Sequence, residues 1–151
     1  MIVITDTNIF FSALISPEGL IAQILNERKK IQFLVPDYLL LEIDEHLNKL
    51  SQYLKKAPKD IKKDFNALLE GMKILSIDDI SLENNKKAET IAAEIDIDDA
   101  PFIAFHLEFH HKIWTGDKEL IKGLKNKGYN ICITTEELKN YSYKKTKMFD
   151  T

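Results

Sequence analysis

Short apolar runs recur along the chain and are followed by polar or turn-forming residues. Residues 2–5 are apolar or β-branched and lead directly into Asp6. A run this short and this apolar predicts a strand buried on both faces, as in a parallel sheet. Four later runs predict further strands, at residues 31–35, 73–77, 112–115 and 129–134.

The stretches between these runs repeat apolar residues at helical spacing. Residues 11–14 predict a short helix or a loop, and the polar, lysine-rich tail from Glu136 predicts a helix that frays. Strands that alternate with helices predict an α/β fold whose mainly parallel central sheet is covered on both faces. We expect the other helices from Leu20 to the basic stop at Arg28, from the cap Asp37 through Leu54, from Pro58 to Gly71, from Ser81 through Ile95, from Ala100 through Phe105 and from Lys118 to Gly128.

Length and composition indicate an ordinary globular protein. The 151 residues fit a single domain spanning 1–151. No apolar run approaches the roughly 20 residues of a membrane span, and the N-terminus lacks the basic region and cleavage site of a signal peptide, so no membrane partner is expected. The single cysteine, Cys132, cannot form an internal disulfide, which favours a reducing cytoplasm, and its apolar surroundings predict a small core residue.

The net charge of −3 argues against a protein that coats nucleic acid with a broad basic face. It does not exclude a nuclease, because an enzyme that gathers carboxylates to hold metal ions carries a local acidic excess. Lysines that bind phosphate groups can then lie at the rim of such a site.

Four carboxylates fall where the predicted layout brings chain segments to one edge of the sheet. Asp6 ends the first strand, and Asp117 follows the strand at 112–115 by two residues. Asp99 lies at the start of a helix, with Asp98 as the expected N-cap. Glu42 lies about one and a half turns into the helix after the second strand. In open α/β sheets ligands bind beyond the carboxyl ends of the strands, so this edge is a candidate site.

Each carboxylate also has a simpler interpretation. Asp6, Asp99 and Asp117 are suited to capping the helices that follow them. Glu42 belongs to an acidic helix segment that is mostly solvated, although its neighbour Ile43 places it at the border of the buried face. That all four side chains fall on one edge by accident is less plausible than each simple interpretation taken alone.

Carboxylates that lie close together repel and raise one another's pKa unless cations intervene. A hard divalent ion with oxygen ligands resolves this conflict, and Mg²⁺ or Mn²⁺ is the natural choice. Two such ions about 3.5–4 Å apart can activate a water and stabilise the leaving oxygen of a phosphodiester. The pattern therefore predicts metal-assisted hydrolysis of a phosphate ester.

Other chemistries find little support in the sequence. The four histidines form no HExxH pattern and have no cysteine partner, which argues against a zinc site. No Gly-rich phosphate loop and no GxSxG elbow is present. The histidines are His46, His106, His110 and His111.

Four short motifs, taken in order and with their spacing, resemble the PIN domain over nearly the whole chain. Each motif is weak alone, whereas the ordered set is fairly specific. Phe105-His106 stands where small apolar residues usually follow the third motif. This departure concerns local packing rather than the acidic set. The motifs are Asp6-Thr7-Asn8, Pro36-x5-Glu42-Ile43, Asp99-Ala100-Pro101-Phe102-Ile103-Ala104 and Thr115-Gly116-Asp117.

The resemblance implies a three-layer α/β/α sandwich and a metal-dependent endonuclease that acts on RNA. It makes Asp6, Glu42, Asp99 and Asp117 the catalytic, metal-binding set for Mg²⁺ or Mn²⁺. It adds Asp96 as a further acid of lower rank. It also implies that three side chains orient the carboxylates, as polar groups around metal ligands do: Thr7, Asn8 and Thr115.

The chain is most similar to small stand-alone prokaryotic PIN proteins, many of which are toxins of toxin–antitoxin pairs. The resemblance implies a homodimer, a small antitoxin that covers the site, and an RNA substrate. Lys118 and Lys122 beside Asp117 are candidates for steering the RNA backbone, although a solvated helix face is the more common role. A second hypothesis is a PIN-fold binding or scaffold protein with little or no catalysis.

Overall fold

The computed structural model describes residues 1–149, with side chains described for residues 1–142. Five strands form one sheet in the order β3-β2-β1-β4-β5, and every neighbouring pair is parallel. The predicted parallel sheet is therefore confirmed. The strands are β1 (Ile2–Thr5), β2 (Gln32–Pro36), β3 (Lys73–Leu75), β4 (Lys112–Trp114) and β5 (Cys132–Ile133).

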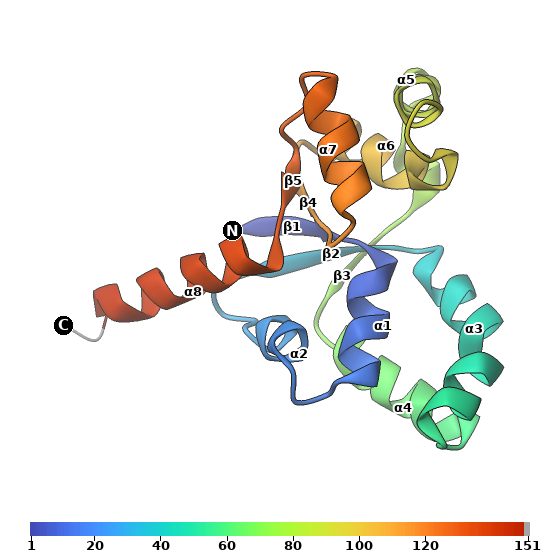
Figure 1. The fold of residues 1–151 in the computed structure, drawn as a ribbon, viewed down its shortest axis with the longest axis vertical. Helices are drawn as coiled ribbons and strands as arrows, with labels where there is room; N and C mark the ends of the chain where they lie inside the picture. Colours follow the sequence, from blue (N-terminus) through green and yellow to red (C-terminus); the bar gives the residue numbers. More distant parts are fainter. Residues whose placement is uncertain (150–151) are drawn as a thin grey trace.

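Helices cover both faces of this sheet and complete the predicted α/β/α sandwich (Figure 1). Helices α1–α4 and α8 contribute to one core cluster with the sheet, and α5–α7 contribute to the other. The helices are α1 (Thr7–Ile15), α2 (Leu20–Leu25), α3 (Leu39–Leu54), α4 (Pro58–Leu69), α5 (Leu82–Ala92), α6 (Ala100–Phe109), α7 (Lys118–Asn126) and α8 (Thr135–Phe149), with short 3-10 turns at Ile77–Asp79 and Ile97–Asp99.

Successive strand residues point to opposite faces and so divide the core in two. Val3 packs under α1–α4, whereas its neighbour Ile4 packs under α5–α7. Trp114 and Ile113 divide in the same way, and all four side chains are fully buried. Because both faces are apolar, the strands show continuous apolar runs rather than alternation, which is the pattern that the sequence displayed.

The strand order reverses direction at β1. The chain builds β2 and β3 on one side of β1 and then returns to place β4 and β5 on the other side. Crossovers in opposite directions put their helices on opposite faces, so the loops after β1 and β4 separate and leave a crevice there. The carboxyl ends of β1 and β4 meet at this switch point, where the amide of Asp6 donates to the carbonyl of Trp114 at 3.1 Å.

Several predicted boundaries differ from the observed ones. The helix predicted to be capped by Asp37 begins after Tyr38 instead, and the Asp37 carboxylate accepts from the amide of Ile77 at 3.4 Å. The strand predicted at 129–134 is limited to the two residues of β5, which pair with β4. The predicted tail helix runs to Phe149, and residues 150–151 of that tail lie outside the described residues.

Two further expectations from composition can be compared with the structure. Cys132 is a free, buried residue of the core beneath α5–α7, as predicted. No helix within the described part of the chain is long and apolar enough to cross a membrane.

Candidate active site

Asp6 caps a helix and also lines the crevice at the switch point. It is the N-cap of α1: its Oδ1 accepts from the amide of Asn8 at 3.2 Å. Its Oδ2 accepts from the hydroxyl of Thr115 at 2.8 Å. The side chain is buried, and burial raises its pKa, while these two hydrogen bonds oppose the rise. A capping oxygen keeps further lone pairs, so a cap and a metal ligand are compatible roles.

Thr115 joins the ends of the two central strands. Its hydroxyl donates to Asp6 and also accepts from the amide of Asp117 at 3.1 Å. Asp117 in turn caps α7, because its Oδ1 accepts from the amide of Leu120 at 3.1 Å. The hydroxyl of Thr115 is fully buried. It thus fixes the loop that carries Asp117 and also the orientation of the Asp6 carboxylate.

Replacing Thr115 by valine should therefore disturb the site more than its size suggests. Thr115→Val keeps the shape but removes the donor to Asp6 and the acceptor for the Asp117 amide, so we expect the free energy of unfolding to fall by about 1–3 kcal/mol. The pKa of Asp6 should rise further, since a hydrogen bond that favours its charged form is lost. Chemical denaturation and carboxyl-carbon NMR titration measure the two effects. Thr115→Ser keeps the hydroxyl, so it should leave the pKa of Asp6 unchanged and lose only the stability that the buried methyl group contributes. A pKa of Asp6 equal to that of the wild-type protein in the valine variant would contradict the assigned role.

Glu42 lies in the first turn of α3 and borders the same crevice. Burial raises its pKa, the charge of Asp6 raises it further, and His46 one turn along the helix lowers it. The hydroxyl of Thr7 also lowers the Glu42 pKa. The interaction with Asp6 places Glu42 beside the switch point, as the layout predicted.

Asp99 occupies the N-cap position of α6 but makes no side-chain capping bond. Its Oδ2 is buried and has no hydrogen-bond partner among the described residues. Burial, together with the charges of Asp6, Asp117 and the neighbouring acids, raises the pKa of Asp99 to about 7. A buried carboxylate oxygen without a partner is costly and calls for a function.

The expected capping pattern before α6 was wrong. Asp98 was expected as the N-cap with Asp99 inside the helix, whereas Asp96 caps a 3-10 turn over Ile97–Asp99, its Oδ1 accepting from the amide of Asp98 at 3.0 Å. The helix α6 then begins at Ala100, with Asp99 at its N-cap position. Asp99 is thereby released from capping and turned toward the other carboxylates.

All five predicted acids line one pocket of about 200 Å³. Two of the predicted orienting residues, Thr7 and Asn8, line it as well. The third, Thr115, does not line the pocket but donates a hydrogen bond to Asp6, which does. Asp98 is an additional lining acid that the sequence argument treated only as a cap. The complete lining is Asp6, Thr7, Asn8, Glu42, Asp96, Asp98, Asp99, Phe102 and Asp117.

The donor set fits a hard divalent cation. Within residues 1–142, no three histidine, cysteine, aspartate or glutamate side chains come together as a ready-made metal cluster. The pocket nevertheless offers carboxylate oxygens as its donors, which Mg²⁺ and Mn²⁺ prefer. The unpartnered Oδ2 of Asp99 and the raised pKa of its carboxyl are both features that a bound cation would relieve.

Tyr38 lies beside this site, against the lining residue Phe102, and was not among the residues expected from the sequence. Its hydroxyl is buried without a hydrogen-bond partner among the described residues, and its ring contacts Phe102 edge-on at 5.7 Å. Burial raises its pKa, and the charges of Glu42, Asp6 and Asp99 add to the rise. The signal was available, because Tyr38 precedes Glu42 by four residues and therefore lies on the same side of the helix start.

Comparison with known proteins adds family information to this geometry. A family model described as PIN domain matches residues 4–143. Among curated proteins, none matches the chain. The fold is similar to the crystal structure of VapBC2 from Rickettsia felis bound to a DNA fragment from their promoter, with a TM-score of 0.64, 15% identity, and coverage of 89% of this chain and 97% of that one. It is also similar to PAE2754 from Pyrobaculum aerophilum, with a TM-score of 0.64, 16% identity, and coverage of 93% and 88%.

Proposed function

The chain belongs to the PIN domain family, and we propose that it is a metal-dependent endoribonuclease, the toxin of a toxin–antitoxin pair. The observation that carries the proposal is the meeting of four carboxylates in one pocket at the switch point of a parallel sheet. Ligands bind at this point in open α/β sheets. The four proposed catalytic and metal-binding residues are Asp6, Glu42, Asp99 and Asp117.

In this proposal the four carboxylates hold Mg²⁺ or Mn²⁺, with Asp96 as a further acid. When bound, such ions supply an activated water and stabilise charge on the phosphodiester oxygens. Thr115 and the Asn8 amide hold Asp6 in place through their hydrogen bonds. Asp99 has a pKa of about 7, so near neutral pH it binds a proton part of the time and releases it as a cation binds.

The proposal that RNA is the substrate rests on the resemblance to RNA-cleaving PIN proteins. The exposed Lys118 and Lys122 on α7, beside Asp117, are proposed to steer the phosphate backbone. The positive charge of these lysines attracts the phosphates of any RNA, so it positions the RNA without selecting a sequence.

Removal of divalent metal tests the proposal directly. Purified protein is incubated with mixed unstructured RNA in Mn²⁺, in Mg²⁺ and in excess chelator. We expect cleavage with either ion, complete loss with chelator, and recovery when Mn²⁺ is restored, because the carboxylates alone provide no charge stabilisation for the phosphate. A mock preparation from cells without the gene controls for contaminating nuclease. Cleavage that continues in chelator would contradict the proposal.

The proposed partners follow the same resemblance. We propose that the chain forms a single domain that spans 1–151 and that two copies associate as a homodimer. We further propose that a small antitoxin neutralises this dimer. The similarity of fold to the VapBC2 structure supports this context without establishing it for this chain. A short neighbouring reading frame that encodes a DNA-binding fold would be the most informative genomic observation.

The alternative is a PIN-fold binding or scaffold protein with little or no catalysis. One observation favours it: residues 1–142 contain no ready-made three-residue metal cluster. Titration calorimetry with Mn²⁺ separates the two functions. Binding below millimolar concentrations favours the nuclease, and failure to bind at millimolar Mn²⁺ favours the scaffold.

A further inference from the structure

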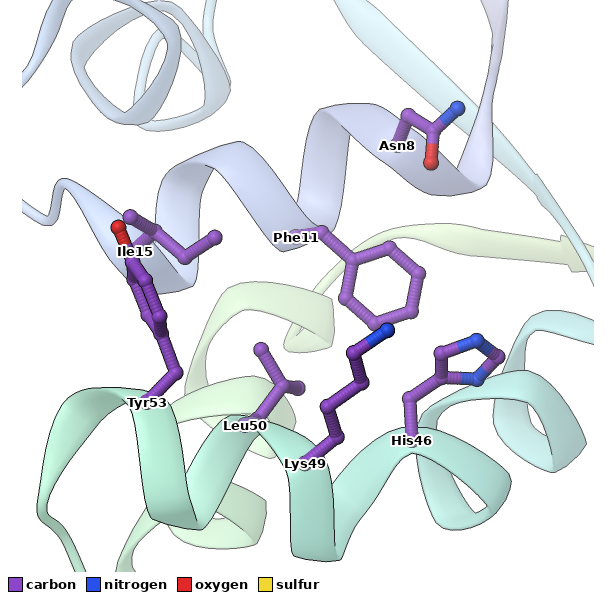
Figure 2. Close-up of a pocket in the computed structure, with 7 residues that line it drawn as sticks. All are labelled: Asn8, Phe11, Ile15, His46, Lys49, Leu50 and Tyr53. Atoms are coloured by element: carbon purple, nitrogen blue, oxygen red, sulfur yellow. The ribbon is translucent and has the colours of Figure 1, made fainter.

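A second pocket, of about 340 Å³, lies between α1 and α3 (Figure 2). Its residues recur at helical spacing on the two facing helix surfaces, so the pocket follows from the packing of the helices. The volume is at the lower end of the range of about 300–1,000 Å³ for small-molecule sites. The lining residues are Asn8, Phe11 and Ile15 from α1, and His46, Lys49, Leu50 and Tyr53 from α3.

The pocket adjoins the acidic site at one end. Asn8 lines both pockets, and its backbone amide is the group that binds Asp6. On the facing helix, His46 lies one turn beyond Glu42, its Nδ1 is 3.0 Å from the Glu42 carbonyl oxygen, and its charge lowers the Glu42 pKa. A polymer bound at the carboxylates can therefore extend into this pocket.

Aromatic rings give the pocket its flat, apolar surfaces. The rings of Phe11 and His46 face each other with centroids 5.4 Å apart and planes inclined at 49°. Figure 2 shows Phe11 reaching from α1 toward α3, while Tyr53 rises from α3 beside Ile15. Tyr53 is 72% exposed and Ile15 41% exposed, so a ligand in the pocket can reach both side chains from solvent.

The charge in the pocket is positive, opposite to that of the neighbouring acidic site. Lys49 is exposed and points into the space between the helices in Figure 2. Among the side chains of residues 1–142, four lysines form ion pairs with carboxylates and Lys49 is not one of them. Its charge is therefore available to an anionic ligand, and the ring nitrogens of His46 add polar groups to the same wall.

We propose that this α1–α3 pocket binds the base of a nucleotide that flanks the scissile phosphate of a single-stranded RNA. The base stacks on Phe11 or Tyr53, and Lys49 binds the adjoining phosphate. Aromatic stacking beside a cation is how proteins hold unpaired nucleic acid. A base in a duplex is already paired and stacked, so the pocket selects unpaired RNA. The inference rests on the proposed ribonuclease function and adds the substrate class to it.

Charge complementarity is what favours RNA over a protein as the occupant. An apolar peptide segment would use Ile15, Leu50 and the rings but would leave Lys49 and the adjoining carboxylates without a role. A nucleotide uses all three kinds of group, because it carries an aromatic base, a phosphate beside it, and a second phosphate at the acidic pocket.

Exposed residues allow a test that leaves the fold intact. Tyr53→Ala and Lys49→Gln are compared with two matched controls that lie outside the pocket, Leu41→Ala on the same helix and Lys63→Gln on α4. The probe is a short, unstructured, fluorescein-labelled RNA. Its Kd is measured in excess chelator, where it is not cleaved, and the steady-state constants for its cleavage are measured in Mg²⁺. Thermal unfolding verifies that all four variants are folded.

We expect Tyr53→Ala to raise Kd and KM about 5- to 100-fold, the range for loss of one base–aromatic stack. Lys49→Gln should raise both by a smaller factor and reduce their dependence on salt. In both variants kcat at saturating RNA should change less than KM. The control variants should match the wild-type protein.

A base-deleted RNA identifies the contact more closely. Removing one base next to the cleaved bond should weaken binding to the wild-type protein as much as Tyr53→Ala does. The two changes together should cost little more than either alone, because they remove the same contact. Bases elsewhere in the probe should behave additively with Tyr53→Ala.

The results separate this inference from the proposed function. Unchanged Kd and KM in Tyr53→Ala, with normal metal-dependent cleavage, would overturn the pocket assignment and leave the ribonuclease standing. Variants that change self-association in light scattering, but not RNA constants, would equally overturn it and assign the pocket to a protein. Absence of RNA cleavage by the wild-type protein would remove the proposed function itself, and with it this subsite.

Discussion

Asp6→Asn is expected to reduce metal-dependent RNA cleavage at least about 100- to 1,000-fold, the loss seen when one charge-stabilising group is removed from an active site. Asp6 is the most buried carboxylate of the set and is in electrostatic contact with the other three. Removing its charge lowers the affinity of the pocket for a cation at its centre. It also removes an oxygen ligand, which an amide replaces poorly for Mg²⁺.

The fold of this variant should survive. The side-chain amide that Asp6→Asn introduces still offers one oxygen to the backbone amide of Asn8, so the cap of α1 is retained. The amide is cheaper to bury than a charged carboxylate, but its NH₂ group replaces the oxygen that accepts from Thr115. Because these two effects oppose each other, we expect an unfolding temperature close to that of the wild-type protein.

Two measurements verify this prediction. Cleavage is followed in Mn²⁺ with equal amounts of both proteins, and Mn²⁺ affinity is measured by calorimetry. The variant should be nearly inactive and should bind Mn²⁺ at least about tenfold more weakly, as for disturbed metal ligands and their supports. Equal cleavage by the two proteins would instead indicate a contaminating ribonuclease and remove the enzymatic assignment.

The sheet and the positions of Asp6 and Asp117 were predictable from the sequence for a physical reason. A strand buried on both faces must be a continuous apolar run, and a helix that follows it at once needs a cap. The first polar residue after such a run is therefore both a cap and a group at the carboxyl edge of the sheet. Asp6 and Asp117 fulfil both conditions.

The turn before α6 was not predictable in detail, because several local solutions compete. Asp96, Asp98 and Asp99 are all good caps, and the choice among them depends on how α5 and α6 pack. The structure inserts a 3-10 turn, gives the cap to Asp96 and leaves Asp99 without one. The spacing in the sequence correctly placed Asp99 near the site. It could not predict that one oxygen of the Asp99 carboxylate would be left without a hydrogen-bond partner among the described residues.

The α1–α3 pocket was invisible in the sequence because it depends on tertiary packing. The beginning of α1 was ambiguous between helix and loop, so the face that carries Asn8 and Phe11 could not be assigned. Tyr53 belongs to the C-terminal part of α3, where an aromatic residue is most simply a core residue, yet it is 72% exposed. Only the packing of α3 against α1 brings these residues together.

Asp99→Asn is expected to stabilise the metal-free protein at high pH, and the sign follows from the direction of the pKa change. The pKa of Asp99 rises from 3.8 to about 7 in the folded state. Between these values the folded protein binds more protons than the unfolded chain, so the free energy of unfolding falls as pH rises through this window. The loss is complete above pH 7, and asparagine avoids it because it does not ionise.

The expected gain is about 1–2 kcal/mol at pH 8, after allowance for the solvent that reaches this half-buried side chain. It corresponds to an unfolding temperature about 3–6 °C higher for a chain of this length. At pH 4 the two proteins should unfold together, and Asp79→Asn, which changes an exposed aspartate outside the pocket, should have no such pH-dependent effect. Adding Mn²⁺ at pH 8 should reverse the order, since a ligand that binds the native carboxylates stabilises the wild-type protein more than the variant. A variant no more stable than wild type in chelator at pH 8 would show that the Asp99 carboxylate is not under electrostatic strain, and would weaken the argument that this pocket is arranged for a cation.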